Sequence, residues 1–94
     1  MSSLSFLIER AFKRTFTQSR YVATPWSISF VDCLGYTYFE IFHKDKRILS
    51  GNTADKEITV LSNDQEIVQK AVTDFIAVRP KYKVNYPEGS TADE

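Results

Sequence analysis

The stretch "GYTYFEIFHKDKR" (residues 35–47) holds four aromatic side chains within seven positions and then four consecutive charged residues. Gly35 at its start and the charged run at its end predict turns, so the segment between them is predicted to be a β-strand. A strand of a small domain usually buries one face and exposes the other, yet this one carries apolar groups on both faces. The second face therefore needs either a cover or a partner.

The segments on either side of this strand identify its neighbours. In "WSISF" (residues 26–30), apolar residues alternate with serines, which predicts a half-buried strand. Before it, "TQSRYVATP" (residues 17–25) breaks the pattern and is predicted to be a loop that ends at a proline. The chain begins with an amphipathic helix, because apolar residues recur there at helical spacing: Leu4, Leu7, Ile8, Ala11 and Phe12, with Phe16 one turn further.

The second half of the chain predicts two short strands, a helix and a last strand. "RILSG" (47–51) and "KEITVL" (56–61) are the strands, and "SNDQEIVQKAVTDFIAVRP" (62–80) is a helix with one apolar face that Pro80 ends. Ser62 with Gln65, or Asn63 with Glu66, has the spacing of a capping box. "KYKVNY" (81–86) alternates again and is predicted to be a late strand with a charged outer face.

This order predicts an α+β fold: an antiparallel sheet of four to five strands with two helices packed on one face, in the order α-β-β-β-(β)-α-β. Residues 1–86 form one domain in this interpretation, and residues 87–94 form a disordered acidic tail. Phe39 and Ile41 are predicted to face the helices. The outer face then presents three aromatic residues around a carboxylate: Tyr36, Tyr38, Phe42 and Glu40.

Two interpretations of that outer face remain open. In one, the sheet curls strongly, Tyr36 and Tyr38 pack on Trp26 and Ile28, and nothing binds there. In the other, an aromatic patch is left for a partner or for a second copy of the chain. Homodimerisation through this face is compatible with either function considered below.

Composition limits the class of protein. Twelve basic and twelve acidic residues give a net charge of zero, which works against a general nucleic-acid binder. The single cysteine, Cys33, excludes an intramolecular disulfide and favours a reducing compartment. The chain has no apolar run long enough for a signal peptide or a spanning helix, so we expect a cytoplasmic protein without a membrane partner.

The residues that usually carry chemistry are scarce. One histidine, His43, is predicted in an exposed charged turn, and one histidine with one cysteine cannot complete a zinc site. The three glycines, at 35, 51 and 89, are too scattered for a phosphate-binding loop. We therefore expect no enzymatic activity, no metal and no cofactor.

These observations favour a small protein-binding module, such as an inhibitor, an adaptor or an immunity-type protein. It would act by occlusion through an aromatic sheet face or an edge strand, as many small phage- or plasmid-borne inhibitors do. Tyrosine and tryptophan dominate contact energetics, and 14% of the chain is aromatic. The predicted contact residues are Tyr36, Tyr38, Glu40, Phe42, Tyr82 and Tyr86.

The alternative is a nucleic-acid-binding domain with a helix–three-strand–helix core. Its predicted binding residues are Lys44, Lys46, Arg47, Lys81 and Lys83, with Arg10, Lys13 and Arg14. The element order over about residues 4–78 is similar to that of the double-stranded-RNA-binding domain, and Gly35, Tyr38 and Phe42 follow the spacing of that family's loop motif, with tyrosine where the family has histidine. The second helix departs from the family, because it begins with "SNDQE" where the family has phosphate-binding lysines. The sequence is therefore not assigned to that family.

Overall fold

The computed structural model describes residues 3–13 and 19–87. In this part of the chain there are two helices and six strands. In chain order they are α1 (Ser3–Ala11), β1 (Arg20–Ala23), β2 (Trp26–Cys33), β3 (Tyr36–His43), β4 (Lys46–Asn52), β5 (Glu57–Val60), α2 (Gln65–Val78) and β6 (Lys83–Asn85).

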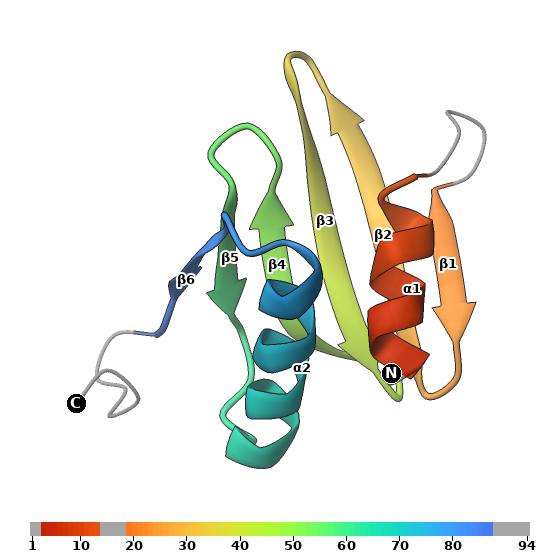
Figure 1. The fold of residues 1–94 in the computed structure, drawn as a ribbon, viewed down its shortest axis with the longest axis vertical. Coiled ribbons are helices and arrows are strands. Elements are labelled where there is room, and N and C mark those ends of the chain that lie inside the picture. Colours follow the sequence, from red (N-terminus) through yellow and green to blue (C-terminus); the bar gives the residue numbers. More distant parts are fainter. Residues whose placement is uncertain (1–2, 14–18, 88–94) are drawn as a thin grey trace.

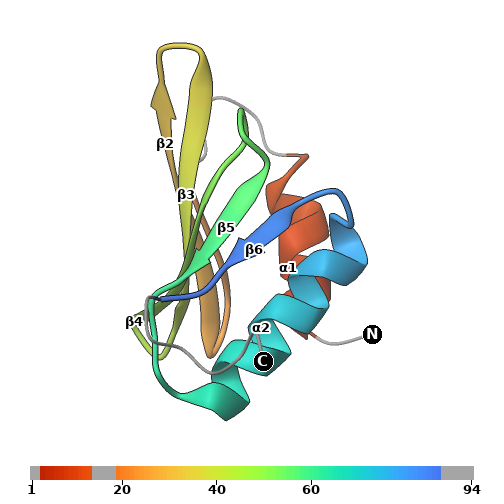
Figure 2. The same cartoon turned by 90° about the vertical axis from the view of Figure 1, so that its left-hand side faces the viewer.

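The six strands form one sheet in the order β1-β2-β3-β4-β5-β6, and both helices lie on the same face of it (Figures 1 and 2). The first five strands form an antiparallel meander, whereas β6 pairs in parallel with β5. The α+β class and the position of the helices are as predicted. The number of strands and the purely antiparallel pairing were wrong.

Both corrections have a physical reason. The segment Arg20–Ala23, predicted to be part of a loop, pairs with β2 because a tight turn at Thr24–Pro25 joins the two strands. This strand places only Tyr21 and Ala23 on the covered face, so the alternation of apolar and polar residues is too short and weak to indicate a strand. At the other edge, α2 connects β5 to β6, and a helical crossover returns the chain in the same direction.

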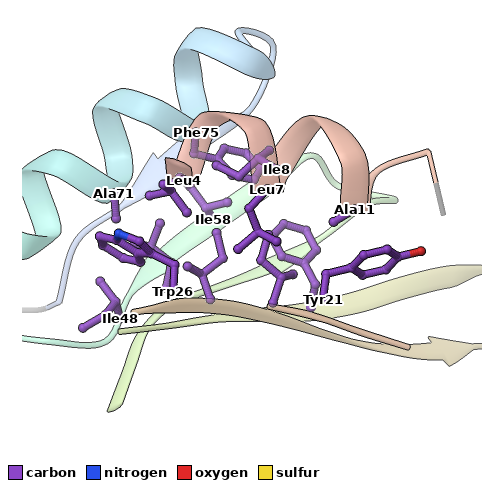
Figure 3. Packing of buried hydrophobic residues seen from close by; sticks show 14 of the residues in the cluster. Leu4, Leu7, Ile8, Ala11, Tyr21, Trp26, Ile48, Ile58, Ala71 and Phe75 are labelled. Carbon is purple, nitrogen blue, oxygen red and sulfur yellow. The ribbon is translucent and has the colours of Figure 1, made fainter. Parts of the chain in front are cut away.

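Aromatic rings fill the centre of the covered face. Phe39 and Phe75 stack with their ring centroids 5.6 Å apart, which joins β3 to α2. Phe12, just after α1, packs edge-on against both rings, at 5.2 Å from Phe39 and 5.7 Å from Phe75. Buried aliphatic residues surround this cluster, among them the stripe predicted on the first helix: Leu4, Leu7, Ile8 and Ala11 (Figure 3). Phe16, which was predicted to extend the stripe, lies outside the described residues.

Strand β4 departs from simple alternation. Its pairing with β3 shifts register between Ile41 and Phe42, so that Ile48 is an extra residue of the strand. As a result, Ile48 and Leu49 are both buried although they are consecutive. The bulge thus gives one strand two adjacent core side chains.

The start of α2 was only approximately predicted. Asp64 is the N-cap residue, and its carboxylate accepts a hydrogen bond of 3.3 Å from the backbone N–H of Ile67. Neither proposed capping pair is used, because Ser62 instead accepts a bond of 3.1 Å from the Asp64 N–H. The helix ends at Val78, two residues before Pro80, as the proline predicts. Apart from Pro87, the predicted tail lies outside the described residues.

Candidate contact surface on the open sheet face

The face of the sheet opposite the helices is called the open face here, because no described helix or strand covers it (Figure 2). Its side chains come from alternate positions of the strands, as the pairing register defines them. Across β2 and β3 they form four facing pairs: Ser27 with Phe42, Ser29 with Glu40, Val31 with Tyr38, and Cys33 with Tyr36.

The predicted orientation of β3 is confirmed. Phe39 and Ile41 are fully buried on the covered face. Tyr36, Tyr38 and Phe42 lie on the open face together with Glu40. The interpretation in which Tyr36 and Tyr38 pack on Trp26 and Ile28 was wrong. Trp26 and Ile28 point to the covered face and are buried there, on the opposite side of the sheet from the two tyrosines.

The outer end of the β2–β3 hairpin brings together three exposed apolar residues. This hairpin extends past the strands on either side of it (Figure 1). Leu34 at the tip is fully exposed, Val31 is 59% exposed and Tyr36 is 40% exposed. Gly35 next to the tip has a φ of 89°, a conformation that favours glycine in a tight turn. We call Val31, Leu34 and Tyr36 the hairpin patch.

Polar contacts in the middle of the open face organise the side chains of β3. The Tyr38 hydroxyl donates a hydrogen bond of 3.3 Å to Glu40, and the Arg47 guanidinium donates one of 3.2 Å to the same carboxylate oxygen. These contacts balance the Glu40 charge and direct the Tyr38 ring along the strand. Exposed pairs of this kind add little stability, about 0–1 kcal/mol, so their main effect is on orientation.

Tyr36 interacts with the cysteine that faces it. A hydrogen bond with the Cys33 side chain raises the pKa of Tyr36 above its ordinary value, and electrostatic interactions with Cys33 and Asp55 act in the same direction. A raised pKa keeps the phenol protonated at neutral pH. Tyr36 therefore presents a neutral ring and hydroxyl, which suits a contact residue better than an acid–base catalyst.

The two late tyrosines do not join this surface. Tyr82 lies on the covered side, where its ring centroid is 5.0 Å from that of Phe75. Burial there raises the pKa of Tyr82. Tyr86 is exposed just beyond β6, at the far edge of the sheet from the hairpin. The structure thus brings together Tyr36, Tyr38, Glu40 and Phe42 but leaves Tyr82 and Tyr86 apart from them.

Sequence reasoning missed Val31 and Leu34. Val31 continues the alternation of Ser27 and Ser29, so the periodicity of "WSISFV" already places it on the outer face. Leu34 precedes Gly35 in a two-residue turn, and a side chain at the tip of such a turn has nothing to pack against. Both residues were detectable once the hairpin was recognised.

The described basic residues of the nucleic-acid alternative lie in two regions of the fold. Lys44, Lys46 and Arg47 are at the β3–β4 turn, whereas Lys81 and Lys83 are at β6. Arg10 and Lys13 are on or next to α1, and the ring of Phe12, beside Lys13, lies 6.3 Å from the ring of Tyr82, which stands between Lys81 and Lys83. Arg14 lies outside the described residues. The Phe12–Tyr82 contact therefore brings the chain at Lys13 near Lys81 and Lys83, whereas the β3–β4 turn lies at the other end of the sheet (Figure 1).

His43 differs from its predicted setting. It is the last residue of β3 rather than part of an exposed turn, it is half-buried, and its ring centroid lies 4.6 Å from that of Trp26. Among residues 3–13 and 19–87, no group of three or more histidine, cysteine, aspartate or glutamate side chains is arranged to hold a metal ion. None of the described helices has the length and apolar character that a membrane span requires.

Comparisons of the chain with protein-family models, with curated proteins and with solved structures find no match in any of the three.

Proposed function

We propose that this protein is a small, non-enzymatic protein-binding module, of the inhibitor, adaptor or immunity type, that acts by occlusion through its open face. One observation carries the proposal. Both helices cover the same face of the sheet, and the uncovered face of one hairpin carries Val31, Tyr36, Tyr38 and Phe42, with the exposed Leu34 at its tip. The centre of the contact is the hairpin patch, with Tyr38 and Phe42 continuing it along β3.

The physical properties of this surface suit protein recognition. Tyrosine and large aliphatic residues that become fully desolvated in an interface supply most of its binding energy. The side chains are held on paired strands, so little backbone entropy is lost on binding. The polar residues next to them, Glu40 and Arg47, already balance one another and can form a hydrated rim.

The distribution of charge favours a protein partner over a nucleic acid. Phosphate binding needs several cations within reach of one backbone, and the cations of the β3–β4 turn lie at the other end of the sheet from those near α1 and β6 (Figure 1). The open face itself carries a carboxylate among its aromatic residues, at Glu40, which accepts a hydrogen bond from Tyr38. A neutral, aromatic protein surface is the better complement.

The test is a comparative affinity capture from a lysate of the source organism. Three immobilised proteins are compared: the wild type, the triple variant Val31→Ser, Leu34→Ser, Tyr36→Ser, and the control Leu61→Ser. Leu61 is a matched control because it is also an exposed leucine, 44% exposed, but it follows β5 at the opposite end of the sheet. Each capture is run with and without nuclease.

The proposal predicts a protein that the wild type and the control retain, that survives nuclease, and that the triple variant loses. With the purified partner, each single substitution should weaken binding by about tenfold, which corresponds to about 1.4 kcal/mol. Equal retention by the folded triple variant would show that the open face is not the contact surface. Capture that disappears with nuclease would favour the nucleic-acid alternative.

A further inference from the structure

The free edge of β1 lies beside a groove formed by α1. The groove has a volume of about 440 Å³. Its apolar wall consists of Phe6, Leu7 and Ala23, and Phe6 is 60% exposed. It lies on the covered side of the sheet, so it is separate from the open face and from the function proposed above.

The backbone of β1 is oriented for pairing at this edge. The Ser19 carbonyl accepts a hydrogen bond of 2.7 Å from the Phe30 N–H, so odd-numbered residues here turn their backbone groups toward β2. Antiparallel pairing alternates, and Val22 therefore points its N–H and C=O away from β2. Within the described chain β1 ends the sheet, and the Val22 side chain is 52% exposed.

The other edge of the sheet differs in the features that prevent pairing. Strand β6 has three residues, is flanked by Lys81 and carries Lys83, and Pro87 follows it. Short strands, lysines and prolines are the usual means by which proteins protect a sheet edge. A proline also follows β1, at Pro25, but β1 is one residue longer than β6 and carries no lysine, so it is the edge more open to strand addition.

The groove also carries an organised positive charge. The guanidinium of Arg10 is held over the Tyr21 ring, with its carbon 5.9 Å from the ring centroid. Lys13 lines the same groove, and Glu9 is the one acidic residue among its described lining residues. A strand added beside β1 would direct alternate side chains into this groove, where an apolar residue would meet Phe6 and a carboxylate would meet Arg10.

We propose that the β1 edge and the α1 groove together bind an extended, acidic peptide segment of a partner protein by β-strand addition. Backbone hydrogen bonds to Val22 provide the pairing, and an apolar side chain flanked at alternate positions by carboxylates fills the groove. A second copy of this chain is a poorer occupant. A two-fold pairing of β1 with its copy would bring Arg10 and Lys13 of both chains together on one side of the joined sheet.

The experiment uses a synthetic peptide of defined sequence, Gly-Glu-Thr-Leu-Thr-Glu-Thr-Gly, acetylated and amidated at its ends. In a strand, its glutamates and leucine share one face, so a carboxylate reaches Arg10 in either strand direction. Binding to the isotope-labelled full chain is followed by backbone NMR up to about 2 mM peptide, which detects dissociation constants near 1 mM. We expect saturable shifts at Phe6, Arg10, Val22 and Ala23, and none at Leu34.

Matched changes separate the two parts of the site. Val22→Pro removes the outward N–H without touching the pairing with β2, whereas Val22→Thr keeps it. Arg10→Gln with Lys13→Gln removes the groove cations, and Lys81→Gln with Lys83→Gln removes the same charge elsewhere. We expect the proline variant and the groove variant each to bind about tenfold more weakly, while both controls bind as the wild type does.

The peptide provides a test that does not depend on how a variant folds. Two methylated peptides are compared. One carries N-methyl groups on its threonines, and the other carries them on its glutamates and leucine, so each lacks one of the two alternating sets of N–H groups. Strand pairing predicts that only one of the two peptides loses affinity. No saturable shift with the wild type would overturn the proposal, as would equal losses from both methylated peptides. Self-association of the peptide-free protein that Val22→Pro abolishes would assign this edge to a second copy instead. None of these outcomes depends on the open face, so they leave that proposal unaffected.

Discussion

The two faces of the same strands carry different side chains: those on the covered face form the core, and many of those on the open face remain exposed. On the covered face, β3 places Phe39 and Ile41 among rings and aliphatic groups that are completely buried. On the open face, the same strand places Tyr36, Tyr38 and Phe42 beside serines, a glutamate and an arginine, and all three remain at least partly exposed. We therefore expect substitutions on the covered face to cost more stability than substitutions at the exposed positions of the open face.

The comparison shows how packing alone can locate a candidate binding surface. Aromatic residues on the covered face are accounted for by packing, because each contacts other core rings. The hairpin patch has no such explanation, since it makes no contribution to the buried cluster. Residues whose type is costly to expose and whose position adds nothing to the core are the best candidates for binding.

The largest expected effect comes from adjacent residues on opposite faces of β3. Phe39→Ala should lower the free energy of unfolding by about 4 kcal/mol, because it empties the centre of the ring cluster. Tyr38→Ala should lower it by about 1 kcal/mol, because only cross-strand contacts and one exposed hydrogen bond are lost. Urea unfolding of the two variants measures the difference. Similar losses in both would show that the open face also carries the fold.

A glycine on the covered face gives the next effect. Gly51 faces Phe39 across β3 and β4, and a Cβ added at Gly51 would lie within the volume of the Phe39 ring. Since that ring is held against Phe75, Gly51→Ala should destabilise the protein by about 3 kcal/mol. The neighbouring Ser50→Ala, on the open face, should stay within about 0.5 kcal/mol. Thermal unfolding checks both, and a neutral Gly51→Ala would mean that the ring has room to move.

A smaller effect is expected from the hairpin patch. The triple variant Val31→Ser, Leu34→Ser, Tyr36→Ser should change the free energy of unfolding by less than about 1 kcal/mol, because these side chains are already exposed. Circular dichroism with urea unfolding provides the measurement. A loss of several kcal/mol would instead give these residues a structural role and would remove the argument that they are kept for binding.

The smallest effect concerns pH. Burial raises the pKa of Tyr82 above its ordinary value of about 10, so the folded state keeps this proton at a pH where the unfolded chain loses it. Stability from this group is therefore complete below about pH 10 and falls as the pH rises toward the folded-state pKa. Tyr82→Phe should show a shallower alkaline decline in the free energy of unfolding than the wild type. If the free energy of unfolding of both proteins falls equally between about pH 9 and 11, the range around the ordinary phenol pKa, the Tyr82 ring is effectively solvated.

Sequence periodicity predicted those elements that have a strong apolar pattern. The helical stripes of α1 and α2 and the alternation of β2 and β3 identified both the elements and their buried faces. It failed where the pattern was weak or interrupted. Strand β1 has only four residues and one large core side chain. The bulge at Ile48 breaks the alternation of β4. At the start of α2, two capping-box pairs were as plausible from the sequence as the observed cap at Asp64.

The candidate surfaces were predicted to different extents. Tyr36, Tyr38, Glu40 and Phe42 follow from the alternation of one strand, and their grouping needed only the correct choice of face. Tyr82 alternates with the lysines of the predicted charged outer face, so the pattern already placed its ring on the covered side, where it meets Phe75; its choice as a contact residue did not follow from that pattern. The groove beside β1 combines residues from two elements, one of which was not predicted, so no pattern along the chain could indicate it.

The amino-acid sequence by itself determined the local structure: which segments are helices or strands, and which side of each is apolar, because these properties depend on the spacing of neighbouring residues. Only the tertiary structure decided which strand edges are left unpaired and that β6 runs parallel to β5. These features depend on pairing between segments distant in the chain, where the burial of the whole apolar surface, and not the preference of any one segment, selects the arrangement. For the same reason the open face and the β1 groove, the two surfaces proposed to bind partners, are properties of the assembled sheet.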